Sequence, residues 1–149
     1  MGARGIDTLV KPGGESGGTG GDNYVRTIST EISTDETVAP GGVITQLVVL
    51  GIAAGEKLIV SFCGSFYSGG NDARISLSVD GVVIGGSQRA MTPAAPNNYN
   101  ELSYVGVVEG LVGDHSVEIV NSGVDVLNFL PVSIPEATGA SMVIMVVKA

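Results

Sequence analysis

The sequence predicts an all-β fold, a sandwich or barrel of antiparallel strands in one domain. Three observations support this prediction. Short apolar runs rich in Val, Ile and Thr alternate with turn residues throughout residues 24–149, which is the pattern of many short strands. Glycine makes up 23 of the 149 residues, about twice its usual share of ~7%. No window of helical length keeps a 3.6-residue apolar period without an interrupting Gly or Pro.

The N-terminal segment differs in composition from the rest of the chain. Residues 1–22 contain eight glycines and three large aliphatic residues, which are Ile6, Leu9 and Val10. The stretch 12–21 cannot bury enough apolar surface to offset its backbone entropy, so we expect a flexible linker there. The apolar segment 6–10 before it is then an arm that orders on a partner or, alternatively, a disordered tail. The predicted division is a Gly-rich arm at 1–22 and a core domain at 23–149.

The first strands of the core are bounded by turn signals. Residues 24–32 are rich in Thr, Ser, Val and Ile and predict a strand that ends before the Pro-Gly-Gly turn at 40–42. Residues 43–52 form a nearly continuous apolar run and predict the next strand. A turn at 53–56 then leads into a strand that alternates between a large apolar face and a small polar one.

The large apolar residues of that alternating strand should point into the core; they are Leu58, Val60, Phe62 and Phe66. Residues 74–79 alternate in the same way and run into Asp80-Gly81, the two-residue signal of a type I′ hairpin, before 82–84. A loop is predicted at 91–98. The remaining strands are predicted at 99–108, 115–120, 124–132 and 141–147, which makes eight or nine short strands in all.

Composition excludes several classes of function. The formal net charge is −8 and the pI is about 4.3, so the phosphate backbone of a nucleic acid would be repelled. One Cys and one His can form neither a structural zinc site nor an internal disulfide. The sequence has no apolar run of 18 residues and no N-terminal signal-like apolar segment, so we expect neither a membrane span nor a secretory signal.

The sequence offers few candidates for catalysis. His115 follows Asp114, and such a pair could be half of a catalytic triad. However, neighbours on a strand point to opposite faces, and Ser116 lacks the Gly-x-Ser-x-Gly context of a nucleophile. Cys63 is expected to be a small buried thiol rather than a nucleophile. We therefore expect no enzyme activity, no catalytic residue and no cofactor.

Two Gly-rich segments resemble ligand loops only superficially. Residues 17–21 lack the preceding strand, the Gly-Lys-Ser/Thr ending and the following helix of a phosphate-binding loop. Asn71 and Asp72 could offer oxygens to a calcium ion beside Gly69 and Gly70, but two adjacent groups are better explained by a turn. No metal site is predicted.

The last predicted strand, residues 141–147, is apolar at both sets of alternating positions. A strand in a sheet with one solvated face should instead alternate between apolar and polar residues. Its second face is therefore covered, either by loops of the same chain or by another subunit. The low content of charged residues, 15%, favours another subunit, because the surface of a monomer usually carries more charge.

Four segments of residues 24–148 together resemble the tumour-necrosis-factor-like jelly rolls of tailed-bacteriophage virion proteins. In chain order they are "TQLVVLGIAAGEKLIVSF", "ARISLSVDGVVIGG", "VEGLVGDHSVEIVNSG" and the closing "SMVIMVVKA". The resemblance implies an antiparallel jelly-roll sandwich or barrel of about eight strands, and a homotrimer with the closing strand near the three-fold axis. Small members of this family with an N-terminal arm are capsid decoration (cement) proteins.

The resemblance implies a virion structural protein that binds the outer capsid surface and stabilises the shell. By the same resemblance, we expect the protein to be made in the bacterial host cytoplasm, with its own copies and the major capsid protein as partners and with no nucleic acid or membrane. The predicted capsid contact is the arm residues Ile6, Leu9 and Val10. The predicted trimer interface is Met142, Ile144 and Val146.

The alternative is a phage tail-tip, receptor-binding or lectin-like module that recognises a glycan. Such a module needs an aromatic platform beside polar loop residues. The candidate cluster in the sequence is Tyr99 with Asn97, Asn98 and Asn100.

Overall fold

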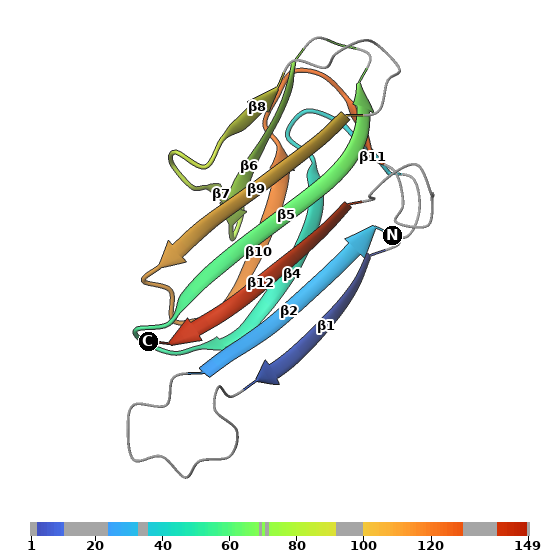
Figure 1. The fold of residues 1–149 in the computed structure, drawn as a ribbon. Helices are drawn as coiled ribbons and strands as arrows, with labels where there is room; N and C mark the ends of the chain where they lie inside the picture. The colour runs from blue at the N-terminus through green and yellow to red at the C-terminus, as the bar shows by residue number, and fades with distance from the viewer. Residues whose placement is uncertain are drawn as a thin grey trace, which may run out of the picture.

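The computed structural model describes residues 3–10, 24–32, 36–68, 70, 72–91, 100–129 and 140–148. These residues form two antiparallel sheets packed face to face, one in front of the other in Figure 1. The described part of the chain contains strands and turns and no helix. The predicted all-β sandwich is therefore confirmed.

The front sheet contains seven strands. Four of them lie side by side in the order β1 (Ala3–Val10), β2 (Tyr24–Ile32), β12 (Ala140–Lys148) and β5 (Lys57–Ser68). Both β9 (Asn100–Glu109) and β11 (Leu127–Phe129) also pair with β5, and β3 (Glu36–Val38) pairs with β11. Every one of these pairings is antiparallel.

The back sheet contains five strands. Its order is β4 (Val43–Ile52), β10 (Gly113–Asn121), β6 (Ala73–Val79) and β7 (Val82–Val83), and β8 (Arg89–Met91) pairs with β6. The long strands alternate between the sheets along the chain: β2, β5, β9 and β12 lie in front, and β4, β6 and β10 lie behind. This repeated crossing is the jelly-roll arrangement.

The hairpin predicted at Asp80-Gly81 is confirmed. Asp80 has φ 51° and Gly81 has φ 80°, which are the two positive φ values that a type I′ turn requires. The turn sets Val79 opposite Val82 and Ser78 opposite Val83. Asp tolerates this left-handed conformation better than most residues with a side chain.

Aromatic rings fill one end of the core between the sheets. Phe62 and Phe66 are 2% and 0% exposed, which confirms the predicted inward face of β5. Both contact the ring of Phe129, with centroids 6.2 Å and 5.6 Å away respectively. Gly64 lies between them on the same strand, and a Cβ atom there would lie 2.8 Å from the Phe62 ring and 2.9 Å from the Phe129 ring. The ring cluster therefore requires glycine at this position.

Replacing Gly64 with Ala should lower the free energy of unfolding by about 1–3 kcal/mol, the usual effect of overpacking a close-packed core. Urea unfolding monitored by circular dichroism measures the change. The matched control is Gly85→Ala, because no atom lies within 4 Å of a Cβ built at Gly85 and the effect there should stay within about 0.5 kcal/mol. Equal stabilities for the two variants would show that the ring cluster adjusts freely.

Candidate interaction surface

Strand β12 has two apolar faces, and only one of them belongs to the core. Met142, Ile144 and Val146 are all 0% exposed and lie between the sheets, in register with the inward residues of β5. The prediction that these three side chains contact another subunit is therefore wrong. Side chains alternate along a strand, so one apolar set must face the core of its own chain.

The other set of β12 side chains points out of the sandwich and forms part of a continuous surface, which we call the front face. It consists of the outward positions of β2, β12, β5 and β9. Pairing across the strands places these positions in rows. One row is Thr27, Met145, Ile59 and Val107, and the next is Ser29, Val143, Ser61 and Val105.

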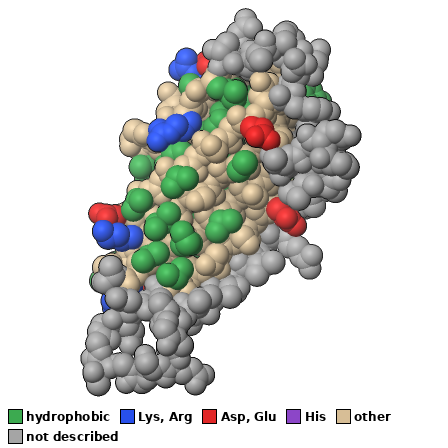
Figure 2. All heavy atoms as spheres, viewed as in Figure 1, with side chains coloured by type: hydrophobic (Ala, Val, Ile, Leu, Met, Phe, Trp, Pro, Cys, Tyr) green, Lys and Arg blue, Asp and Glu red, His purple; other side chains and the backbone are tan. Residues whose placement is uncertain are grey.

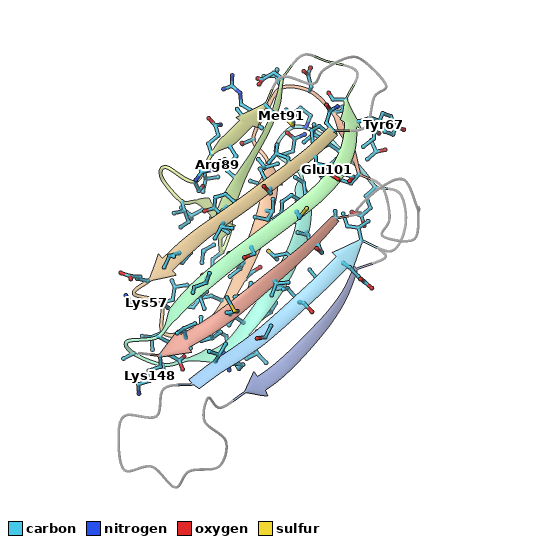
Figure 3. All side chains as sticks on the ribbon, viewed as in Figure 1. Lys57, Tyr67, Arg89, Met91, Glu101 and Lys148 are labelled. Atoms are coloured by element: carbon cyan, nitrogen blue, oxygen red, sulfur yellow. The ribbon has the colours of Figure 1, made fainter. Side chains whose placement is uncertain are left out.

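The centre of the front face carries no charged side chain. Both rows consist of aliphatic residues, Met and small hydroxyl residues, and Figure 2 shows these hydrophobic side chains in the middle of the face with the charged ones toward its margin. Lys57 and Glu109 form a 2.7 Å ion pair at one end of β5 and β9, and Glu101 lies at the other end of β9 (Figure 3). An apolar area with a charged rim is typical of an interaction site.

Several side chains on the front face are exposed to solvent in the single chain. Val105 is 64% exposed and Val107 is 57% exposed. Cys63 is exposed as well, so the expectation of a buried thiol is wrong. Alternation along β5 points Cys63 away from the core because its neighbour Phe62 points inward.

The segment predicted to be an arm is a strand of the front sheet. Residues 3–10 form β1, which pairs with β2 along its whole length and sets Ile6 opposite Ser29 and Leu9 opposite Arg26. Without this pairing the backbone of β2 would be an open edge, which a β-prone segment of the same chain can cover. The linker predicted at 12–21 lies outside the described residues.

The acidic partner of His115 is not its sequence neighbour Asp114, in agreement with the expectation that neighbours on a strand point to opposite faces. Its Nδ1 lies 2.6 Å from Oδ2 of Asp80, whereas Asp114 accepts a hydrogen bond from the Gly51 amide. The hydroxyl of Ser116 accepts a hydrogen bond from Gln46 and donates one to Glu118. The three groups of a triad are therefore not brought together around His115.

The loop candidates are only partly described. Asn71, Asn97, Asn98 and Tyr99 lie outside the described residues, and Asn100 is buried at the start of β9. Asp72 forms a 2.7 Å ion pair with Arg74. In the part of the chain that the structure describes, there is no group of three or more His, Cys, Asp or Glu side chains that could hold a metal ion.

The described residues also include no helix that could cross a membrane.

Comparison with known proteins finds similarity only to solved structures. No protein-family model matches the chain, and no curated protein does. A family 35 carbohydrate-binding module from Clostridium thermocellum is 13% identical, with 95% of this chain and 90% of that one covered and a TM-score of 0.36. The Eiger tumour necrosis factor from S. frugiperda is 12% identical, with 81% and 64% covered and a TM-score of 0.44.

A xylan-binding domain from Paenibacillus barcinonensis is 13% identical, with 99% of this chain and 85% of that one covered and a TM-score of 0.41. At these identities and TM-scores, the ligands of these proteins do not transfer to this chain. The jelly-roll fold itself is shown by the strand order described above.

Sequence reasoning found the part of the front face on β12 and missed the part on β5 and β9. The sequences of β5 and β9 nevertheless contain a signal for this part of the face. Ile59 adds a large aliphatic residue to the polar face of β5, and Val105 and Val107 alternate with inward residues of β9. Large apolar residues at both alternating sets indicate a strand covered on both sides, as they did for residues 141–147.

Proposed function

We propose that this protein is a structural subunit that acts through surface contacts and assembles as a homotrimer through the front face. The observation that carries the proposal is the uncharged centre of that face, which extends over four strands and has its apolar side chains on β12, β5 and β9. The whole chain has a net charge of −8, so most pairs of surfaces would repel each other. Copies that meet at the centre of the front face avoid that repulsion and remove the exposed side chains of Val105 and Val107 from water.

The three-fold order that we propose for the assembly is supported by the resemblance to tumour-necrosis-factor-like virion proteins. We propose, on the same basis, that the trimer decorates the outer surface of a phage capsid. Strand β1 ends the strand order of the front sheet, so the edge that does not face β2 can accept a strand of the major capsid protein. Ile6, Leu9 and Val10 belong to this strand, and three copies on one trimer would bind multivalently.

A glycan-binding module is the second candidate. The observation in its favour is a groove of about 420 Å³ on the outer side of the back sheet, where Ser78, Ser122 and Glu118 lie beside Val83 and Val120. Hydroxyl and carboxylate groups next to an apolar wall can bind a small polyol. However, Phe62, Phe66, Phe129 and Tyr104 are buried and Tyr67 is partly buried. None of the aromatic rings whose burial the structure describes is therefore a fully exposed stacking platform.

Two binding assays separate these roles. Undecorated capsids of the phage that encodes the chain should bring the protein down on sedimentation, and removal of residues 1–10 should weaken that binding strongly because three contacts are lost at once. A glycan array should give no specific signal. Specific glycan binding that is lost in Glu118→Gln, together with no capsid binding, would establish the second candidate instead.

A further inference from the structure

The ring of His115 lies between two hydrogen-bond acceptors. Its Nδ1 is 2.6 Å from the Asp80 carboxylate, and its Nε2 is 3.1 Å from the carbonyl oxygen of Val112. A neutral imidazole has only one N–H and can satisfy only one of them. Its other nitrogen would then direct a lone pair at an acceptor oxygen. Both contacts are favourable only when the ring is doubly protonated and charged.

The carboxylate of Asp80 connects the β6–β7 turn to β10. Its Oδ1 accepts a hydrogen bond of 2.8 Å from the backbone amide of Ser116, and its Oδ2 faces the His115 ring. The backbone amide of Asp80 also donates a hydrogen bond of 2.8 Å to the carbonyl oxygen of Ser116. Asp80 therefore extends the attachment of the turn to β10 beyond the backbone pairing of Val79 with Val117, and part of this attachment depends on the charge of His115.

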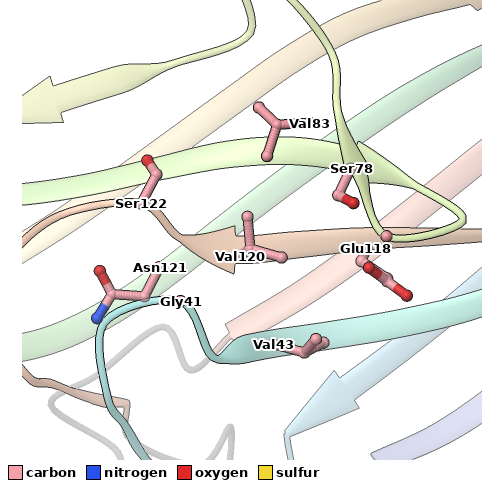
Figure 4. Close-up of a pocket in the computed structure, with 9 residues that line it drawn as sticks. Gly41, Val43, Ser78, Val83, Glu118, Val120, Asn121 and Ser122 are labelled. Carbon is pink, nitrogen blue, oxygen red and sulfur yellow. The ribbon is translucent and has the colours of Figure 1, made fainter.

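This turn forms one wall of the groove on the back sheet. Gly81 and Val83, from the turn and β7, line the groove together with Ser78 of β6. Glu118 and Val120 of β10 form its floor, as Figure 4 shows. A movement of the turn relative to β10 would therefore widen or narrow the groove.

We propose that His115 and Asp80 form a proton-dependent latch that fixes the β6–β7 turn on β10 and so sets the width of the groove. The charged ring closes the latch, and loss of its proton removes both the charge attraction to Asp80 and one of the two hydrogen bonds of the ring, which lets the turn move away from β10. The other charged group near the ring is Asp114, on the same strand, whose Oδ1 is taken by the Gly51 amide at 2.8 Å. The residue opposite His115 on β4 is the uncharged Val49. The latch lies on the back sheet and does not rest on assembly through the front face.

The direction of the pH dependence follows from the two groups. The hydrogen bond to Asp80 raises the pKa of His115 above its ordinary value of 6.5. The latch therefore stabilises the turn fully below that ordinary value, and the stabilisation is lost as the pH rises through the raised pKa. The same hydrogen bond lowers the pKa of Asp80 below 3.8, so the acidic limit of the latch lies below that value. The latch is therefore closed over the pH range between the lowered pKa of Asp80 and the raised pKa of His115.

The test is a nuclear magnetic resonance titration of the intact protein from about pH 5 to about pH 9. His115 is the only histidine of the chain, so its ring signal is unambiguous. We expect the ring to titrate above 6.5, and the amide signals of Gly81 and Val83 to shift with the same midpoint. We also expect the protection of the Ser116 amide against hydrogen exchange, corrected for the intrinsic pH dependence, to fall as the ring loses its proton.

Two variants complete the test. In Asp80→Asn the His115 midpoint should fall to the ordinary value or below it, and the shift of the groove amides should disappear. Asp114→Asn, the matched control, should retain a raised midpoint because Asp114 does not contact the ring. A wild-type ring that titrates at or below 6.5, or groove amides that do not follow it, would overturn the latch even if neither variant folds.

Discussion

Val107→Glu is expected to convert the assembled protein into single folded chains. Val107 is 57% exposed in the single chain and lies in the central row of the front face, so the carboxylate should not disturb the fold. In the assembly, however, it would be an unpaired charge in an apolar contact, which costs about 3–5 kcal/mol when no partner is present. Light scattering coupled to gel filtration measures the mass of the variant, and circular dichroism shows whether it is folded.

The matched control is Val48→Glu. Val48 is 53% exposed on β4 of the back sheet, so the substitution adds the same charge at a position of similar exposure on the opposite side of the sandwich. It should leave the mass unchanged. If both variants keep the wild-type mass, the front face is not the contact between copies; if both lose it, the effect comes from charge alone.

Phe62→Ala is expected to lower the free energy of unfolding by about 3–5 kcal/mol, the usual range for removal of a buried Phe ring. Phe62 is 2% exposed and packs edge-on against Phe129, so the substitution leaves a cavity and removes one side of the ring cluster. Unfolding in urea, with the slope compared between variants, measures the change. Val48→Ala, at an exposed position, should change stability by no more than about 0.5 kcal/mol. A loss below about 1 kcal/mol for Phe62→Ala would contradict the observed facing of β5.

Much of the fold can be predicted from local signals in the sequence. The pair Asp80-Gly81 specifies its hairpin because few other dipeptides adopt two positive φ values. Phe62 and Phe66 predict the facing of β5 because the alternate positions of that strand are mainly small or polar. The jelly-roll order of the strands follows from the family resemblance instead, since periodicity does not specify which strands pair.

The facing of β12 could not be predicted from its own residues. Val143, Met145 and Val147 are as apolar as Met142, Ile144 and Val146, so hydrophobicity does not distinguish the two sets. The choice is made by the neighbouring strands, because pairing places Ile144 beside Ile28 of β2 and Val60 of β5, which both face the core. The facing of such a strand is a property of the sheet.

Two other features of the structure also depend on contacts between residues that are far apart in the sequence. His115 and Asp80 are 35 residues apart in the sequence, and they meet because β6 and β10 are neighbours with Val79 opposite Val117. Nothing local distinguishes Asp80 from Asp114 as the partner of His115. Similarly, residues 3–10 have the composition of either a strand or an arm, and the presence of an unpaired edge on β2 decides between them.

Sedimentation equilibrium of the unaltered protein at micromolar concentration tests the central claim, assembly through the front face, most directly. The expected result is a single folded species with three times the 15.0 kDa mass of one chain. A folded species with the mass of one chain would contradict that claim, because the apolar centre of the front face would then be stable in contact with water.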